Sequence, residues 1–236
     1  MISARRAAAT TAKRRTVVAA PPLLQSGDRL TATEFLRRYE AMPEVKKAEL
    51  INGIVYMASP VRAKQHGIPD NIIQGWLFTY VASTSGVWAA ANSTVRFDAD
   101  NIPQPDALLM IKSGGQAKIG KDGYVHGAPE LVVEIAASSA ALDLHGKLDA
   151  YRRAGVREYL VWQPVEKICR WFVLEDDNFI ALEPDRQHLL RSQVFPGLTL
   201  DVQALVRENA AGVLAALNKS LGKAAHRSFA AKLTKR

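Results

Sequence analysis

Hydrophobic residues recur with helical spacing in two segments of the N-terminal half of the chain. Thr31 and Glu34 have the spacing of a capping box, and the apolar residues after them predict a short helix over residues 31–41. A second helix is predicted over residues 64–83, with Pro69 in its first turn or at a kink. The apolar positions that give this second segment its period are Ile68, Ile72, Ile73, Trp76, Leu77, Tyr80 and Val81.

Shorter apolar runs predict strands. Residues 49–57 form two such runs about Asn52-Gly53, the dipeptide typical of a type I′ hairpin turn. Further strands are predicted at 87–91, 93–97, 106–111, 131–136, 158–162, 168–174 and 179–182. A helix is predicted over residues 141–154, with Gly155 as its C-cap. This order predicts a mixed α/β fold, in which helices flank a central mixed sheet and a β-hairpin lies near the N-terminus.

Length and composition agree with the predicted mixed α/β fold. At 236 residues and 48% hydrophobic composition, the chain suits one globular domain with extensions. Its apolar runs fall short of the roughly 18 residues that a membrane span requires, so we expect a soluble protein. The single cysteine, Cys169, excludes an internal disulfide and fits a small core residue in a reducing compartment, so a cytoplasmic location is expected.

The net charge of +8 is concentrated at the two ends of the chain. Residues 1–20 carry five Lys or Arg and no acid, residues 207–236 carry seven and one acid, and the body between them has a charge of −3. We therefore expect a basic, disordered arm over residues 1–22 and a folded domain over residues 23–206. A C-terminal helix should begin near Val202 and run into a basic helix or tail over 207–236. Basic ends attract nucleic-acid phosphates, although solvated tails have the same composition.

Two acids mark the candidate chemistry. Asp106 follows Pro105 at the entrance of one predicted strand, and Glu134 lies inside the apolar run 131–135. A buried carboxylate is costly unless it is paired or binds a metal. Carboxylates from adjacent strands supply the oxygen ligands that Mg²⁺ prefers, with Mn²⁺ as a substitute, and leave coordination sites for water and phosphate. The alternatives are an ordinary turn aspartate at Asp106 and a structural ion pair between Glu134 and Lys147.

A second group of polar residues accompanies these acids. Asp143, Lys147 and Tyr151 are spaced by four and share one face of the predicted helix. Lys147 is suited to stabilise charge on a reacting phosphate or to align water, although a surface Asp–Lys pair explains the spacing equally well. Glu49, beside the hairpin turn, is a candidate further acid, and His66 a candidate phosphate contact or proton shuttle. Each has a purely structural alternative.

Taken in order, these segments resemble the Uma-type restriction endonuclease family of the PD-(D/E)XK nuclease superfamily. The matching segments are 49–60, the surroundings of His66, 104–106, 128–135, 143–151, 154–162 and 195–198. The resemblance implies a restriction-endonuclease-like core over about residues 28–206, Mg²⁺-dependent phosphodiester hydrolysis and frequent homodimers. It implies that Asp106 and Glu134 bind the metal and that Lys147 is the catalytic cation. Glu49, His66 and Tyr151 complete the implied site.

One position departs from the superfamily pattern. The pattern has a lysine two residues after the second acid, where this chain has Ala136. Lys147, from the following helix, is then the natural replacement. The sequence therefore predicts a metal-dependent endonuclease acting on nucleic acid, with DNA as the expected substrate. The alternative is a DNA-binding or accessory protein that retains the nuclease fold without catalysis.

Overall fold

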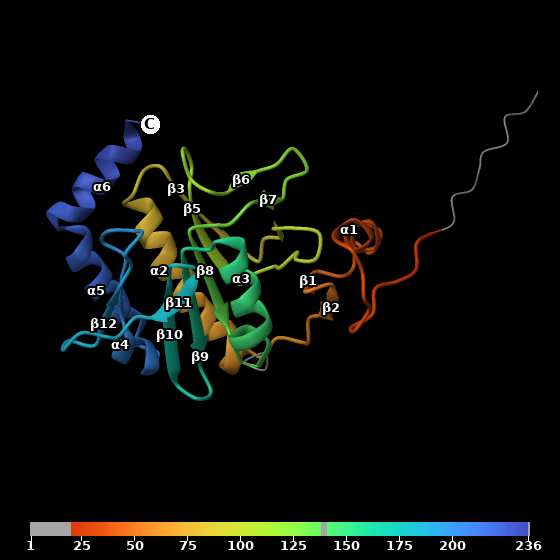
Figure 1. Ribbon diagram of the computed structural model, residues 1–236. Helices are drawn as coiled ribbons and strands as arrows, with labels where there is room; N and C mark the ends of the chain where they lie inside the picture. Colours follow the sequence, from red (N-terminus) through yellow and green to blue (C-terminus); the bar gives the residue numbers. More distant parts are fainter. Residues whose placement is uncertain (1–19, 138–140, 236) are drawn as a thin grey trace, which may run out of the picture.

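A six-stranded mixed sheet forms the centre of the protein (Figure 1). The computed structural model describes residues 20–137 and 141–235. Within them, the strand order is β11-β10-β9-β8-β5-β3, and β8 and β9 form the parallel pair of an otherwise antiparallel sheet. The strands are β3 (Val87–Ala91), β5 (Ala107–Ile111), β8 (Leu131–Ile135), β9 (Glu158–Gln163), β10 (Ile168–Glu175) and β11 (Asn178–Ala181). The predicted mixed α/β class is confirmed.

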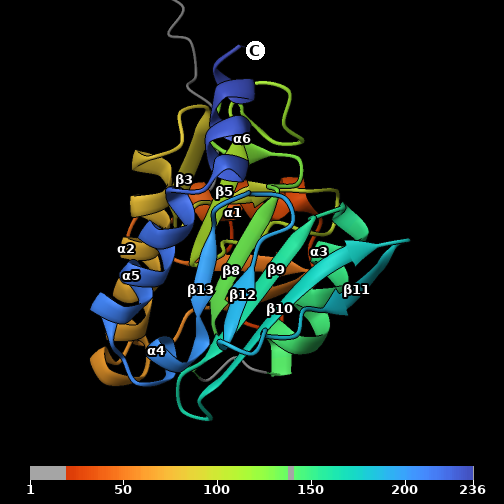
Figure 2. The same cartoon turned by 90° about the vertical axis from the view of Figure 1, so that its left-hand side faces the viewer.

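One face of the sheet is covered by helices from both halves of the chain (Figure 2). They are α2 (Ile68–Ala82), α4 (Val202–Val206), α5 (Ala210–Leu221) and α6 (Ala224–Thr234), together with the small sheet of β12 (Leu189–Arg191) and β13 (Thr199–Asp201). Trp76 of α2 meets Trp171 edge-on and donates a hydrogen bond from Nε1 to the carbonyl oxygen of Thr199 at 2.9 Å. The largest hydrophobic cluster therefore joins α2 to the C-terminal segments.

The opposite face is covered by α3 (Leu148–Ala154), which continues a π-helical turn, η2 (Leu142–Lys147). Tyr151 of α3 is fully buried against Tyr159 of β9. A three-stranded sheet of β4 (Val95–Arg96), β6 (Lys118–Ile119) and β7 (Val125–His126) covers the neighbouring part of β5. Even-numbered side chains of β5 and β8 therefore point toward these covering elements, and odd-numbered ones toward α2.

An N-terminal unit adds a third small core. Helix α1 (Ala32–Glu40) packs on the hairpin of β1 (Ala48–Ile51) and β2 (Ile54–Met57). Asn52 and Gly53 both have positive φ, 51° and 73°, as the predicted type I′ turn requires. Leu50 forms an antiparallel bridge with Ile102, so the hairpin is attached to the segment that leads into β5.

The predicted helices at 31–41, 64–83 and 141–154 are present, but two of them begin with a π-helical turn. These turns are η1 (Ala63–Gly67), before α2, and η2, before α3. The strand predicted at 93–97 shortens to β4, and four short strands, β6, β7, β12 and β13, were not predicted. Strand β4 is short because it pairs with β7 in a separate three-stranded sheet and does not join the central sheet.

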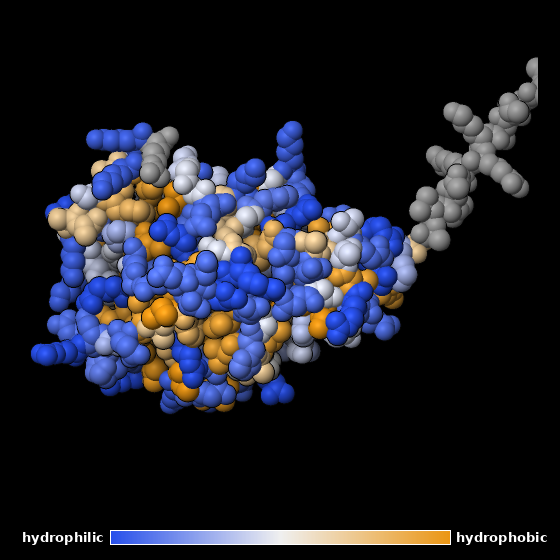
Figure 3. Space-filling model, viewed as in Figure 1, coloured by the Kyte–Doolittle hydropathy of each residue, from blue (hydrophilic) through white to orange (hydrophobic). Residues whose placement is uncertain are grey.

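The segment after residue 206, expected as a basic helix or tail, forms α5 and α6. Val213, Leu217 and Leu233 from these helices are buried in the same cluster as α2 and the sheet. Residues 1–19 of the expected N-terminal arm lie outside the described residues. No helix in the described part of the chain is long and apolar enough to span a membrane. On the face drawn in Figure 3, a band of hydrophilic side chains crosses the middle, with hydrophobic surface below it.

Candidate active site

Asp106 and Glu134 lie side by side at the ends of two paired strands. The antiparallel register joins Ala107 to Val133, and continuing it by one residue sets Asp106 opposite Glu134. Both side chains leave the sheet on the face that α3 covers. The backbone N–H of Ile135 donates to Oδ2 of Asp106 at 2.8 Å, which fixes the aspartate across the strands. Asp106 is 3% exposed and Glu134 is 2% exposed, so both predicted acids are buried.

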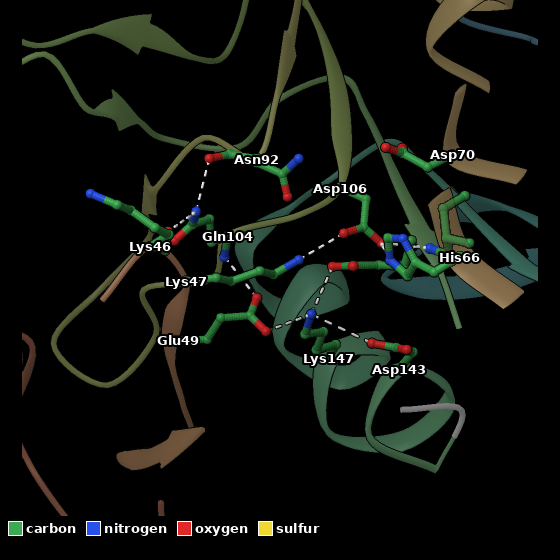
Figure 4. A network of polar contacts seen from close by, with 12 residues as sticks. Lys46, Lys47, Glu49, His66, Asp70, Asn92, Gln104, Asp106, Asp143 and Lys147 are labelled. Atoms are coloured by element: carbon green, nitrogen blue, oxygen red, sulfur yellow. Dashed lines mark hydrogen bonds and ion pairs between the residues drawn. The ribbon is translucent and has the colours of Figure 1, made fainter. Parts of the chain in front are cut away.

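Lys147, the last residue of η2, reaches Glu134 but does not contact Asp106 directly (Figure 4). Its ammonium lies 2.9 Å from Oε1 of Glu134, 2.9 Å from Oε2 of Glu49 and 3.5 Å from Oδ1 of Asp143. Tyr151, one turn further along, donates its hydroxyl to Oε1 of Glu134 at 2.7 Å. The predicted face of Asp143, Lys147 and Tyr151 therefore points inward at Glu134 and does not form a surface pair.

Glu49 comes to this site on the hairpin. It is buried in β1, and its Oε1 accepts a hydrogen bond from the backbone N–H of Gln104 at 2.7 Å. Gln104 in turn donates from Nε2 to the carbonyl oxygens of Lys46, at 3.2 Å, and Asn92, at 2.9 Å. The hairpin is thus held against the segment that precedes Asp106. Because of this contact, an acid 57 positions away from Asp106 in the sequence shares its cavity.

Two basic groups contact Asp106. Nζ of Lys47 lies 2.7 Å from Oδ1, and Nε2 of His66, from η1, lies 3.4 Å from Oδ2. His66 was predicted, but Lys47 was not. Strand alternation could have indicated Lys47, because in an extended segment the residue two positions before Glu49 faces the same side as Glu49.

The charges of these groups depend strongly on one another. Burial opposes ionisation of Asp106, but His66, Lys47 and the N–H of Ile135 outweigh it and hold the pKa of Asp106 well below its usual range. Burial raises the pKa of Glu134, and the ammonium of Lys147 offsets this only in part. The two acids therefore differ in character: Asp106 is a firmly ionised carboxylate, whereas Glu134 holds a proton more tightly than an ordinary glutamate.

The bases of the site are stabilised in their charged forms. Burial alone would lower the pKa of Lys147, but Glu134, Glu49 and Asp143 raise it well above its usual value. Lys47 behaves in the same way, with burial outweighed by nearby carboxylates, so its pKa is also raised. The hydrogen bond with Asp106 raises the pKa of His66. Both lysines are therefore permanent cations of the site, and His66 is protonated more readily than a free histidine.

A cavity of about 730 Å³ opens above these groups. Its polar lining includes five of the six predicted site residues, namely Glu49, His66, Asp106, Glu134 and Lys147. The buried Tyr151 does not line it and acts through Glu134. The end of β2, at Met57, and the loop of residues 58–62 that follows it form one wall. The site is therefore a charged pocket large enough to admit part of a polymer chain.

The donor set suits a hard divalent cation. Four carboxyl groups, those of Glu49, Asp106, Glu134 and Asp143, gather around the ammonium groups of Lys47 and Lys147 and the imidazole of His66. No group of three or more His, Cys, Asp or Glu residues in the described ranges is arranged as a ready metal cage. Mg²⁺ does not need such a cage, because it is commonly held by one or two carboxylates together with water and substrate phosphate. Asp106 and Glu134 are the two carboxylates that would hold such an ion.

Comparison with known proteins supports a nuclease. A family model named Uma2, described as "Putative restriction endonuclease", matches residues 32–203. No curated protein matches the chain. Among solved structures, one described as a putative nuclease belonging to DUF820, from Anabaena variabilis ATCC 29413, superposes with a TM-score of 0.57 at 17% sequence identity. The match covers 74% of this chain and 98% of that one, and it shows that the two share a fold. Since the family model spans most of the chain, the protein belongs to the Uma2 family of restriction endonuclease-like proteins.

Proposed function

We propose that this protein is a Mg²⁺-dependent endonuclease that hydrolyses phosphodiester bonds in DNA. One observation supports this function above others. Two buried carboxylates on neighbouring strands, Asp106 and Glu134, face a cavity of about 730 Å³ together with Lys147. Nucleic-acid backbones are polyanions, and a site that holds a divalent cation beside a fixed lysine is suited to neutralise the charge that develops on a phosphate.

In this proposal Asp106 and Glu134 hold the metal, with Mn²⁺ as a possible replacement for Mg²⁺. The bound metal supplies Lewis-acid chemistry for phosphodiester hydrolysis. Lys147 keeps Glu134 and Glu49 in place and balances their charge, and Tyr151 fixes the orientation of Glu134. His66, half-buried at the cavity wall, is placed to accept or donate a proton near Asp106.

Several further features belong to the same proposal. The basic residues at both ends of the chain would raise affinity for the nucleic-acid backbone without reading sequence. Residues 1–22 would act as a basic arm, residues 23–206 as the nuclease domain and residues 207–236 as a basic helical extension. A homodimer is proposed from the resemblance to the family, and sedimentation analysis would establish its mass. A cytoplasmic location is proposed from the single cysteine.

The first test is metal binding. Mg²⁺ and Mn²⁺ are titrated calorimetrically into the wild type and into Glu134→Gln, first alone and then with an uncleavable DNA analogue that supplies the phosphate ligand. Wild-type binding that Glu134→Gln loses supports a metal site at the predicted carboxylates. Absence of binding in both conditions would refute metal dependence.

The second test is cleavage. Plasmid DNA, linear duplex DNA and RNA are incubated with the protein in Mg²⁺, in Mn²⁺ and in EDTA. Asp106→Asn should reduce cleavage to the EDTA level while the protein remains folded. Asp149→Asn is the matched control, because Asp149 is an exposed partner of Arg152 on α3, outside the cavity lining. Equal cleavage by Asp106→Asn and by the wild type would refute the proposed role of Asp106.

One observation favours a second candidate, a DNA-binding protein without catalysis. The site acids already have protein partners, since Lys47 contacts Asp106, and Lys147 contacts Glu49 and Glu134. This candidate predicts salt-dependent DNA binding that needs no metal. Deleting residues 1–20 discriminates between the nuclease and the non-catalytic DNA-binding protein. The DNA-binding protein would lose its affinity for DNA, whereas the nuclease would retain metal-dependent cleavage. Deleting residues 207–236 is unsuitable, because α5 and α6 belong to the core.

A further inference from the structure

Two lysines line the cavity, and their surroundings differ. The side chain of Lys147 is 3% exposed, and its ammonium lies within 3.5 Å of three carboxylates. The side chain of Lys47 is 24% exposed, and its ion pair is with a single oxygen, Oδ1 of Asp106, at 2.7 Å. Lys147 is enclosed by its partners, whereas Lys47 borders open space in the cavity. Lys47 is therefore the lysine with room to turn toward a bound molecule.

The ammonium of Lys47 also stands at the two carboxylates proposed to hold the metal. It contacts Asp106 directly, and the charge of Glu134 acts on it as well (Figure 4). A divalent cation held by the same pair carries like charge, so it would repel the ammonium and compete for Oδ1 of Asp106. Lys47 in its present position therefore occupies a binding position that the metal needs.

The backbone at Lys47 is fixed, so only its side chain can move. Its carbonyl oxygen accepts a hydrogen bond from the N–H of Ala58, and the next residue, Ala48, is fully buried in β1. A lysine has four flexible methylenes beyond its Cα. When its ammonium leaves Asp106, the side chain can still reach the cavity that it lines.

We propose that Lys47 exchanges partners during the reaction, neutralising Asp106 and Glu134 in the metal-free protein and contacting a backbone phosphate of the nucleic acid once the metal is bound. This inference rests on the proposed nuclease function and assigns the substrate-contacting cation to Lys47. Lys147 is then a positioning residue for Glu49 and Glu134. The exchange would couple the two ligands, because the metal frees the lysine that the phosphate needs.

The exchange predicts opposite effects of one substitution. Lys47→Met should bind Mg²⁺ ~10-fold more tightly than the wild type, because the competing ammonium is gone. The same variant should lose ~100-fold in kcat, because a charged donor to the reacting phosphate is missing. Lys47→Arg keeps the charge and should retain more turnover than Lys47→Met. A residue that only stabilised the fold would not tighten metal binding when removed.

Lys46 provides the matched control. It is the preceding residue, it has the same side chain, and its ammonium donates to the carbonyl oxygen of Pro43, away from the acids. Lys46→Met should leave both metal affinity and turnover unchanged. Mg²⁺ affinity is measured by calorimetry on the full chain, turnover on labelled duplex DNA, and folding of each variant by thermal melting monitored by circular dichroism.

The results separate this inference from the proposed function. If the wild type and Lys46→Met cleave no nucleic acid, the nuclease function falls, and tighter Mg²⁺ binding by Lys47→Met would still support the competition at Asp106. If the wild type cleaves, and Lys47→Met binds Mg²⁺ no more tightly or keeps its turnover, the exchange is overturned. If neither the wild type nor Lys47→Met binds a divalent cation with or without DNA, both are overturned.

Discussion

Replacing Lys147 by methionine should destabilise the metal-free protein by about 3–5 kcal/mol, the usual cost of removing one partner from a buried ion pair. The side chain of Lys147 is 3% exposed, so water cannot replace its charge. Its removal leaves the carboxylates of Glu49, Glu134 and Asp143 close together without the cation that lies among them. Methionine fills a similar volume, so the loss reports charge and hydrogen bonding and not a cavity.

Urea denaturation in EDTA measures this loss. Trp76, Trp162 and Trp171 are buried, so tryptophan fluorescence reports unfolding of the main core. A loss of 3–5 kcal/mol corresponds to a fall of more than ~1 M in the urea midpoint at an ordinary denaturant slope. Lys46→Met, which removes an exposed lysine, should change stability by no more than about 0.5 kcal/mol.

A double-mutant cycle with Glu134→Gln locates the effect. Glu134 accepts from both Lys147 and Tyr151, so its charge should couple to Lys147 by at least ~1 kcal/mol. In the Lys147→Met background, Glu134→Gln removes one of the unbalanced carboxylates and should recover part of the lost stability. A loss below ~1 kcal/mol for Lys147→Met, or strictly additive effects of the two changes, would refute the electrostatic account of this cluster.

Three other predictions concern separate parts of the molecule. Tyr151→Phe removes the donor to Glu134 and should cost about 1.5–3 kcal/mol in urea denaturation, the range for a hydrogen bond to a charged group; an unchanged midpoint would contradict the bond. Glu158 is buried, which raises its pKa above the ordinary value of 4.5, so the folded state binds its proton more tightly than the unfolded state. The stability of the wild type should therefore fall, relative to Glu158→Gln, as the pH rises from 4.5 through the folded-state pKa, and parallel pH profiles would contradict this. Gly86→Ala introduces a Cβ 2.8 Å from Cβ of Leu233, at a φ of +90° that disfavours alanine. The variant should therefore melt at a lower temperature, and its α6 should be cleaved by proteases more readily. If α6 of the variant resists proteolysis as well as α6 of the wild type, the contact between Gly86 and Leu233 is refuted.

Features encoded over a few neighbouring residues could be predicted from the sequence. Asn52-Gly53 specifies its hairpin because both residues tolerate the positive φ that a type I′ turn requires. Glu134 could be found because a charge inside an apolar run contradicts its surroundings unless something pairs with it. The partner itself, Lys147, is 13 residues away and approaches from a different layer of the fold. Helical spacing indicated its face but not which way that face points.

Features that depend on distant contacts were harder to predict. Strand alternation places Lys47, unlike its exposed neighbour Lys46, on the same side as Glu49, but it does not show what that side faces. Only the attachment of the hairpin through Leu50 and Gln104 brings Lys47 to Asp106. The strands β12 and β13 have three residues each, too few to show a period, and they form because each finds its partner across a loop.

A buried alanine, Ala136, stands where the superfamily pattern has a lysine. Ala136 lies two residues after Glu134, is fully buried, and belongs to the hydrophobic cluster that contains Tyr151 and Val156. A lysine there would have to bury four methylenes and an ammonium in a space that aromatic and branched side chains fill, and overpacking a core is itself destabilising. Lys147 avoids this cost because it comes from the last residue of η2, outside the sheet, where three carboxylates stabilise its charge. The charge of Lys147 is shared between Glu134 of the sheet and Glu49 of the hairpin, so the docking of the hairpin contributes to the electrostatics of the candidate site.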